Sequence, residues 1–281
     1  MNIGLQLFRA QNRLLSMINP SEAIERANAL FFTPKRHDPK SWEEQAESAG
    51  QRVRLKNGVS AIVWGQGTPI LLMHGWEGRA TQMAGFIEPL TRQGFQLIAL
   101  DAPAHGRSLG NQSHPMRFVE SMRLAEETYG PFYAVIGHSM GGGCSIYCAL
   151  EGMQVEKVIS IAGPANFKRV SRRFANFIGM SQSVIKRFVE GVEKTVGIPF
   201  AQIDLVARAA ELKQPLLLVH DSDDKEIPIS DAQQLAHAVE NSTLVCMQGL
   251  GHRKIMRDSV MIDTVVNFIV HDTDRFLIEA I

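Results

Sequence analysis

The chain has 281 residues, of which 45% are hydrophobic and 21% charged, which excludes a disordered or collagen-like protein and suffices for one large core. Its 29 basic and 29 acidic residues balance, so no field across the whole molecule favours nucleic acid or an anionic membrane, and small molecules are the expected partners. Cys144, Cys148 and Cys246 fit neither a disulfide framework nor a zinc pattern. We expect them to be small core residues of a cytoplasmic protein that has no membrane span.

Residues 1–40 predict a helical N-terminal extension. Apolar residues recur there at helical spacing, with Arg9 and Arg13 on the opposite side. The apolar positions are Ile3, Leu7, Leu14, Leu15 and Ile18. We expect this face to pack on the body of the protein; contact with a membrane, or with a second subunit of a homodimer, is the alternative.

Apolar runs then alternate with longer helix-compatible stretches, the pattern of a mostly parallel sheet with helices on both faces. The runs 51–55 and 59–64 flank Asn57 and Gly58, a strong hairpin signal that predicts an antiparallel edge. Six more runs follow, at residues 70–73, 95–100, 132–136, 158–162, 215–219 and 243–247. The sequence therefore predicts an α/β fold with a central sheet of about eight strands.

The run 132–136 leads directly into Gly137, His138, Ser139, Met140 and Gly141, a G-x-S-x-G pentapeptide ahead of a helix-compatible segment. A serine there sits on a turn so tight that the flanking positions must lack bulky side chains, which leaves its hydroxyl exposed above the sheet. The pentapeptide in this setting predicts a nucleophile elbow.

Residues 164–206 interrupt the alternation and divide the predicted core into residues 41–163 and 207–281. Within the interval, 180–196 has the apolar spacing of a helix. We expect a short helical lid that roofs the active site and limits substrate size. A basic cluster at its entrance fits a solvated helix face better than a site for an anionic substrate. It consists of Lys168, Arg169, Arg172 and Arg173.

A serine hydroxyl is a poor nucleophile at neutral pH and needs a base. Of nine histidines, His252 is the first after the last predicted strand, and glycines before it would let its loop bring the ring over the sheet edge. His138 points away from Ser139 in a tight turn, so we expect it to pack around the elbow. His74 and His105 are interpreted as holding loops by hydrogen bonds.

With Ser139, His252 and these strands in place, the chain resembles the α/β-hydrolase superfamily over about residues 51–270. In that family the triad runs in the order serine, acid, histidine. The resemblance implies Asp224 as the acid, because it stands four residues before Pro228. Asp221 is interpreted instead as a turn-former.

The remaining aspartates have simpler interpretations. Asp223 is expected in solvent, and Asp231 in the first turn of a helix that Ser230 caps.

Two backbone N–H groups are expected to stabilise the oxyanion. One belongs to Met140, at the start of the helix that follows the elbow. The other is implied by the resemblance, because the segment 74–76, which ends at Trp76, resembles the family's oxyanion turn. Residues 101–108 resemble its strand-end loop, but Ala104 stands where the family has glycine.

Together these features predict a serine hydrolase that cleaves a carboxylic ester through an acyl-enzyme, with no metal and no organic cofactor. The family's lipase-type His-Gly-Gly-Gly loop is absent and the lid is short, so small acyl groups are favoured. Hydrolysis of thioesters, lactones or C–C bonds, acyl transfer, and a hydrolase-like binding module without significant turnover remain alternatives. Residues 28–36 resemble a segment of bacterial hydrolases of this kind, which names no substrate.

Overall fold

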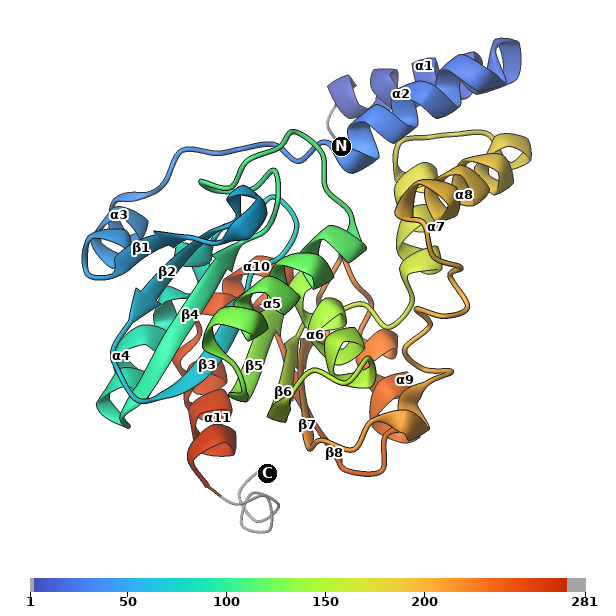
Figure 1. Cartoon of the computed structure of the whole chain (residues 1–281). Helices are drawn as coiled ribbons and strands as arrows, with labels where there is room; N and C mark the ends of the chain where they lie inside the picture. Colours follow the sequence, from blue (N-terminus) through green and yellow to red (C-terminus); the bar gives the residue numbers. More distant parts are fainter. Residues whose placement is uncertain (1–2, 272–281) are drawn as a thin grey trace.

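A computed structural model describes residues 3–271 of the chain. One twisted sheet of eight strands forms its centre, in the order β1-β2-β4-β3-β5-β6-β7-β8 (Figure 1). The strands are β1 Gln51–Arg54, β2 Ser60–Trp64, β3 Thr68–Met73, β4 Phe95–Asp101, β5 Phe132–His138, β6 Val155–Ile161, β7 Leu216–Asp221 and β8 Ser242–Met247. β2 is antiparallel to β1 and β4, and all other neighbours are parallel. The predicted strands and the antiparallel edge are confirmed.

Helices cover both faces of the sheet. They are α1 Ile3–Ile18, α2 Pro20–Phe32, α3 Ser41–Ser48, α4 Ile87–Arg92, α5 Pro115–Tyr129, α6 Met140–Leu150, α7 Phe167–Phe177, α8 Gln182–Val196, α9 Ser230–Ala238, α10 Gly251–Lys254 and α11 Ser259–Val270. Buried side chains form one cluster against α5, α6 and α9 and a second against α4 and α11. The central strands are continuous apolar runs in the sequence because both of their faces are covered.

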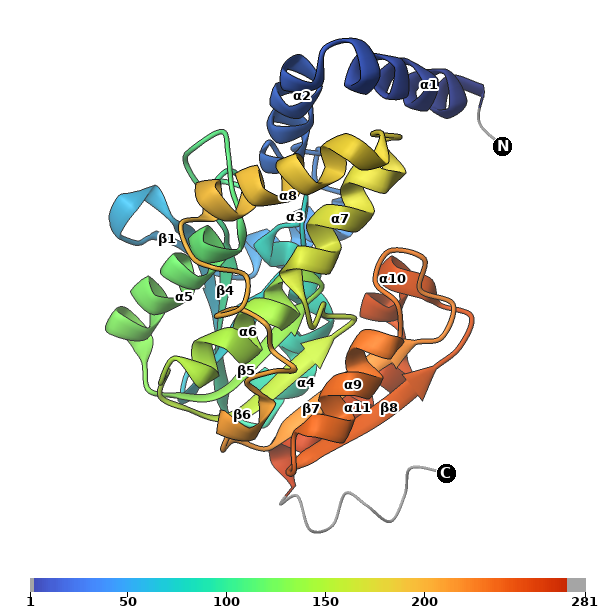
Figure 2. The ribbon, with the colours of Figure 1, turned by 90° about the vertical axis from the view of Figure 1, so that its right-hand side faces the viewer.

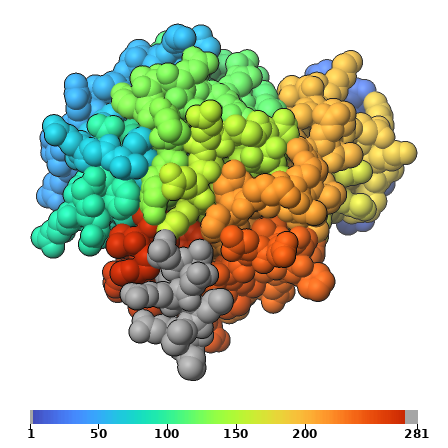
Figure 3. Space-filling model, turned by 60° about the horizontal axis from the view of Figure 1, so that its bottom comes forward, coloured from blue at the N-terminus to red at the C-terminus, as the bar shows by residue number. Residues whose placement is uncertain are grey.

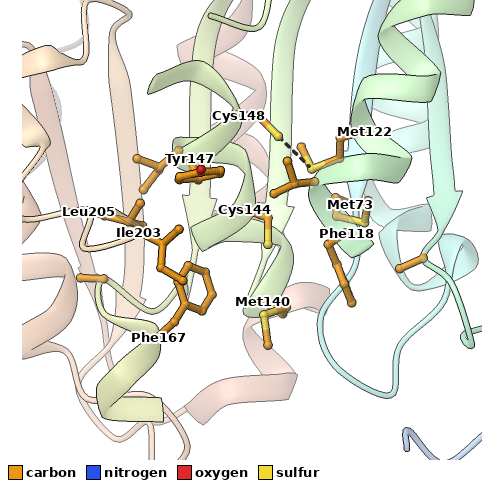
Figure 4. Close-up of a cluster of buried hydrophobic side chains, with 14 of the residues drawn as sticks. Met73, Phe118, Met122, Met140, Cys144, Tyr147, Cys148, Phe167, Ile203 and Leu205 are labelled. Carbon is orange, nitrogen blue, oxygen red and sulfur yellow. Dashed lines mark hydrogen bonds between the residues drawn. The ribbon is translucent and has the colours of Figure 1, made fainter. Parts of the chain in front are cut away.

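Helix α6, which follows the elbow, is buried along most of its length. Figure 4 shows Cys148 toward Met122 of α5, with the two sulfur atoms 3.8 Å apart, and Tyr147 toward the segment that follows α8. Cys144 and Cys148 lie in the core, as predicted. The prediction is wrong for Cys246, which is exposed because β8 is an edge strand.

The interval after β6 holds two helices, where the sequence predicts one. Helix α8 matches the predicted helix and ends at Val196, and the residue that caps it, Gly197, adopts a φ of 80°. The N-terminal helices lie beside this pair (Figure 2), where Phe31 of α2 packs against Phe174 and Phe188 at ring distances of 4.9 and 5.8 Å. In Figure 3 the insert, in yellow and orange, projects beyond the body with the blue N-terminal helices behind it.

The apolar face of α1 does not pack on the body, so the expectation for this face is wrong. Of the five predicted positions, Ile3, Leu7, Leu14 and Ile18 are between 58% and 73% exposed, and Leu15 is half-buried. The helix attaches through a different face, where Ser16 is buried.

No helix within residues 3–271 is long and apolar enough to cross a membrane. The expected boundaries 1–40 and 207–281 include residues 1–2 and 272–281, which lie outside the described part of the chain.

Two glycines in helices provide a matched test of packing. A Cβ on Gly141 of α6 would collide with the carbonyl oxygens of Met73 and His74, the second at 2.6 Å, whereas a Cβ on Gly191 of α8 would meet nothing within 4 Å. We expect Gly141→Ala to lower the free energy of unfolding by about 1–3 kcal/mol, because backbone atoms cannot give way. Gly191→Ala should raise it by up to ~1 kcal/mol through helix propensity. Urea unfolding of both variants measures this, and equal stabilities would contradict it.

Candidate active site

The elbow at Ser139 is a turn between the end of β5 and the start of α6. Ser139 has a φ of 52° and a ψ of −122°, a backbone conformation that is costly for a residue with a side chain. A Cβ on Gly137 would collide with the backbone of Gly141 and Gly142. The turn therefore closes only with glycine at position 137, and it places the serine side chain at the carboxyl end of the sheet.

Ser139, His252 and Asp224 form a chain of hydrogen bonds. Ser139 Oγ lies 2.9 Å from His252 Nε2, and His252 Nδ1 lies 2.7 Å from Asp224 Oδ2. Because the carboxylate can only accept, Nδ1 carries the proton and Nε2 is free to accept from the serine hydroxyl. The three residues follow β5, β8 and β7, whose carboxyl ends meet at one edge of the sheet. The structure thus brings together the three residues that the sequence selects.

The carboxylate of Asp224 is held in its charged form. Burial by itself would raise the pKa of Asp224, but hydrogen bonds from His220 and His252 and from the Ile227 N–H outweigh it and hold the pKa well below its usual range. Oδ1 accepts from the N–H groups of Glu226 and Ile227 at 2.7 and 2.9 Å. Oδ2 is therefore left to orient His252.

His220 is a site residue that sequence reasoning missed. It is buried on β7, and its Nε2 lies 3.0 Å from the carbonyl oxygen of Ile227 and 3.3 Å from Asp224 Oδ2. A histidine four residues before the acid, inside an apolar strand, is the signal that would have found it. It approaches the same carboxylate oxygen as His252 does.

Two other aspartates hold the loop that carries His252. Asp221 accepts from the N–H of Asp223 at 2.8 Å, which is the predicted turn, and its other oxygen accepts from Leu250 N–H at 2.9 Å. Asp223 is exposed as predicted, yet it accepts from Gly249 N–H at 3.1 Å. The acid loop and the histidine loop are thus joined by hydrogen bonds beside the triad.

Two buried histidines support the loops around the triad. His74 Nε2 accepts from Ala102 N–H at 3.0 Å, so Nδ1 donates to Gly75 O at 2.6 Å. His138 Nε2 donates to the carbonyl oxygen of His252 at 2.9 Å. Burial lowers the pKa of His74 to about 4 and that of His138 to about 3, so both remain neutral at pH 7.

The two expected oxyanion donors lie on either side of Ser139. Met140 is the first residue of α6, and Trp76 belongs to the loop after β3. This loop lies against the elbow, because a Cβ on Gly75 would stand 2.7 Å from Ser139 Cβ. Neither N–H donates to another residue in the turns around the elbow within residues 3–271.

A cavity of about 840 Å³ opens beside Ser139 and His252. The side chains of Trp76 and Met140 line it, as expected, and most of the remaining wall comes from α2, α7 and the acid loop. Phe31, Phe174 and Phe177 are among these wall residues. Within the described residues, no group of three or more His, Cys, Asp or Glu side chains is arranged to hold a metal ion.

Two family models match successive segments of the chain. One is described as "alpha/beta hydrolase fold" and covers residues 68–187, and the other is described as "TAP-like protein" and covers residues 186–273. The chain belongs to the α/β-hydrolase superfamily.

Individual relatives agree with this assignment. The AB hydrolase superfamily protein YisY of Bacillus subtilis is 24% identical over 77% of this chain and 97% of its own length. The pimeloyl-acyl-carrier protein methyl ester esterase of Nitrosomonas europaea is 23% identical over 67% of this chain and 90% of its own. The structure of the Pyrococcus furiosus esterase Pf2001 matches with a TM-score of 0.62 and 18% identity, over 84% of this chain and 98% of that one.

The insert and helix α9 of this α/β-hydrolase each correct one expectation. The basic cluster is not simply a solvated helix face. Arg169 pairs with the buried Asp231 at 3.1 Å, and Arg173 lines the cavity. Ser230 is the first residue of α9 and not its cap, which is Ile229. Asp231 also accepts from Ala165 N–H at 2.9 Å, so it ties the insert to the body.

The strand-end loop of this α/β-hydrolase keeps its turn without the family's glycine. Ala104 adopts a φ of 67°, the left-handed region that glycine enters freely. Ala104 therefore holds this turn in a backbone conformation that is costly for a residue with a Cβ.

The burial of His105 in this loop predicts that the folded protein loses stability in acid. Burial lowers the pKa of His105 to about 3, against about 6.5 in an unfolded chain. Between these values the unfolded chain binds a proton that the folded chain does not, so the free energy of unfolding falls as the pH falls, by about 1.4 kcal/mol per pH unit. His105→Phe, which keeps a ring beside Trp76 and Phe118, should reduce the slope by about that amount. Urea unfolding at stepped pH measures it, and parallel curves for wild type and variant would overturn the prediction.

Proposed function

We propose that this α/β-hydrolase is a serine hydrolase that cleaves a carboxylic ester through an acyl-enzyme intermediate. The observation that carries the proposal is the unbroken chain of hydrogen bonds from Ser139 through His252 to Asp224, next to a cavity large enough for a small molecule. A serine hydroxyl bonded to a neutral imidazole, itself oriented by a carboxylate, is the arrangement that activates a nucleophile.

In the proposed reaction Ser139 Oγ attacks the carbonyl carbon of the ester, and its proton passes to His252 Nε2. The charge of Asp224 stabilises the imidazolium. The backbone N–H groups of Met140 and Trp76 donate to the oxyanion. His252 then gives the proton to the departing alcohol, which leaves the acyl group on Ser139. Water repeats the sequence and releases the acid.

The walls of the cavity favour the binding of an apolar acyl group. An acetyl group would fill little of a volume of about 840 Å³, and aromatic side chains of α2 and α7 form part of the wall. Each methylene that enters such a wall contributes up to ~0.8 kcal/mol. The cavity therefore favours acyl chains longer than the small groups that the sequence suggests. The relative from Nitrosomonas europaea, named as an esterase, is consistent with ester cleavage.

Nitrophenyl esters from acetate to laurate test the proposal in wild type and Ser139→Ala. We expect kcat/KM of the wild type to rise from acetate by up to about fourfold per methylene while the chain fits the cavity. Ser139→Ala should lose turnover, because the acyl group has no nucleophile to receive it. Circular dichroism controls for folding of both proteins.

Two results would contradict this account. Equal turnover by wild type and Ser139→Ala would place the chemistry elsewhere. A folded wild type without turnover on esters, thioesters or lactones would favour a binding module on the hydrolase fold.

A further inference from the structure

Exposed large hydrophobic side chains gather at one end of the molecule. Eight of the eleven in residues 3–271 belong to α1, α2 and α7. They are Ile3, Leu7, Phe8, Leu14, Met17, Ile18, Leu30 and Phe177, whereas Leu109, Val260 and Val270 lie elsewhere. Exposed apolar side chains gathered in this way are typical of an interaction site.

Helix α1 supplies most of this surface and presents it outward. Leu7 and Leu14 are 60% and 58% exposed and share one side of the helix with Ile3 and Ile18. The attachment to the body lies on the other side. There Asn12 Nδ2 donates to Ile178 O at 3.0 Å, and the backbone of Arg9 lies so close to Gly179 that a Cβ would stand 2.6 Å from its carbonyl oxygen. The contact with the insert therefore fixes the apolar side of α1 toward solvent.

The charge around this apolar surface is basic, although the chain as a whole is neutral. Helices α1 and α7 contain six basic residues and no acidic ones, and α2 adds Arg26, Glu22 and Glu25, so the three helices together carry seven basic and two acidic residues. Arg169 is neutralised by Asp231. The other five in α1 and α7 form no ion pair with any side chain in the described residues: Arg9, Arg13, Lys168, Arg172 and Arg173. An amphipathic helix with uncompensated arginines beside a leucine-rich face has the features of an interfacial membrane helix.

We propose that α1 docks this protein on an anionic lipid surface, with Leu7 and Leu14 among the acyl chains and Arg13 at the headgroups. A second copy fits this surface less well. In a twofold contact the same surface meets itself, which brings the unpaired arginines of two α1 helices together. Anionic headgroups instead supply the charges that these arginines lack.

The cavity lies at the same end of the molecule as this surface. Arg9, Leu30 and Phe177 belong to the wall of the cavity and also to the apolar and basic surface. The docking depends on α1 alone, so it holds or fails independently of the proposed ester hydrolysis.

Flotation with lipid vesicles tests the docking on the full chain. We expect the wild type to bind vesicles of phosphatidylcholine and phosphatidylglycerol, and to bind pure phosphatidylcholine more weakly. Leu7→Ser with Leu14→Ser should weaken binding by about a hundredfold or more, because two large apolar side chains no longer enter the lipid. The matched control is Leu109→Ser with Val260→Ser, which removes two equally exposed apolar side chains outside this surface and should bind as the wild type does.

A second variant tests the charge. Arg13→Gln keeps the apolar face and should reduce binding to the anionic vesicles and its sensitivity to salt. Absence of vesicle binding by the wild type, or equal loss in both serine pairs, would overturn the proposal. So would a wild-type dimer in light scattering that Leu7→Ser with Leu14→Ser converts to a monomer, because the face would then be covered by a second copy.

Discussion

The hydrogen bond between Asp224 and His252 is the interaction on which the site depends. Its length of 2.7 Å requires the loops after β7 and β8 to meet over the end of β5, where Ser139 sits. Parallel pairing of these strands supplies the common edge, and Asp221 and Asp223 bond directly to the histidine loop. The alignment therefore rests on backbone and carboxylate contacts within the chain and does not need a ligand to form it.

Much of this arrangement could be predicted because it follows from local rules. Glycines at positions 137 and 141 are required wherever a serine turn lies this close to a neighbouring strand, so the pentapeptide indicates its own geometry. The order of strands then places whatever follows β7 and β8 beside Ser139. His252 could be selected from its position after a strand. Asp224 could be selected from its position after a strand together with the family's spacing to Pro228.

The parts that were not predicted depend on contacts between distant segments. Nothing near Arg169 in the sequence shows that Asp231 will reach it, and the burial of His220 beside Asp224 appears only when β7 and its loop are folded. Helix α1 shows the limit of periodicity most clearly. The apolar spacing correctly gave a helix with one apolar side, but the spacing does not say whether protein or another surface covers that side.

The central claim is that Asp224 orients His252 for proton transfer, and kinetics of Asp224→Asn beside Asp223→Asn test it most directly. The asparagine keeps an oxygen for the Glu226 and Ile227 N–H groups, but it would no longer fix the proton on Nδ1. The account predicts a kcat about four orders of magnitude lower for Asp224→Asn and a nearly unchanged kcat for Asp223→Asn. Near-normal turnover of Asp224→Asn, with loss in Asp221→Asn, would contradict it.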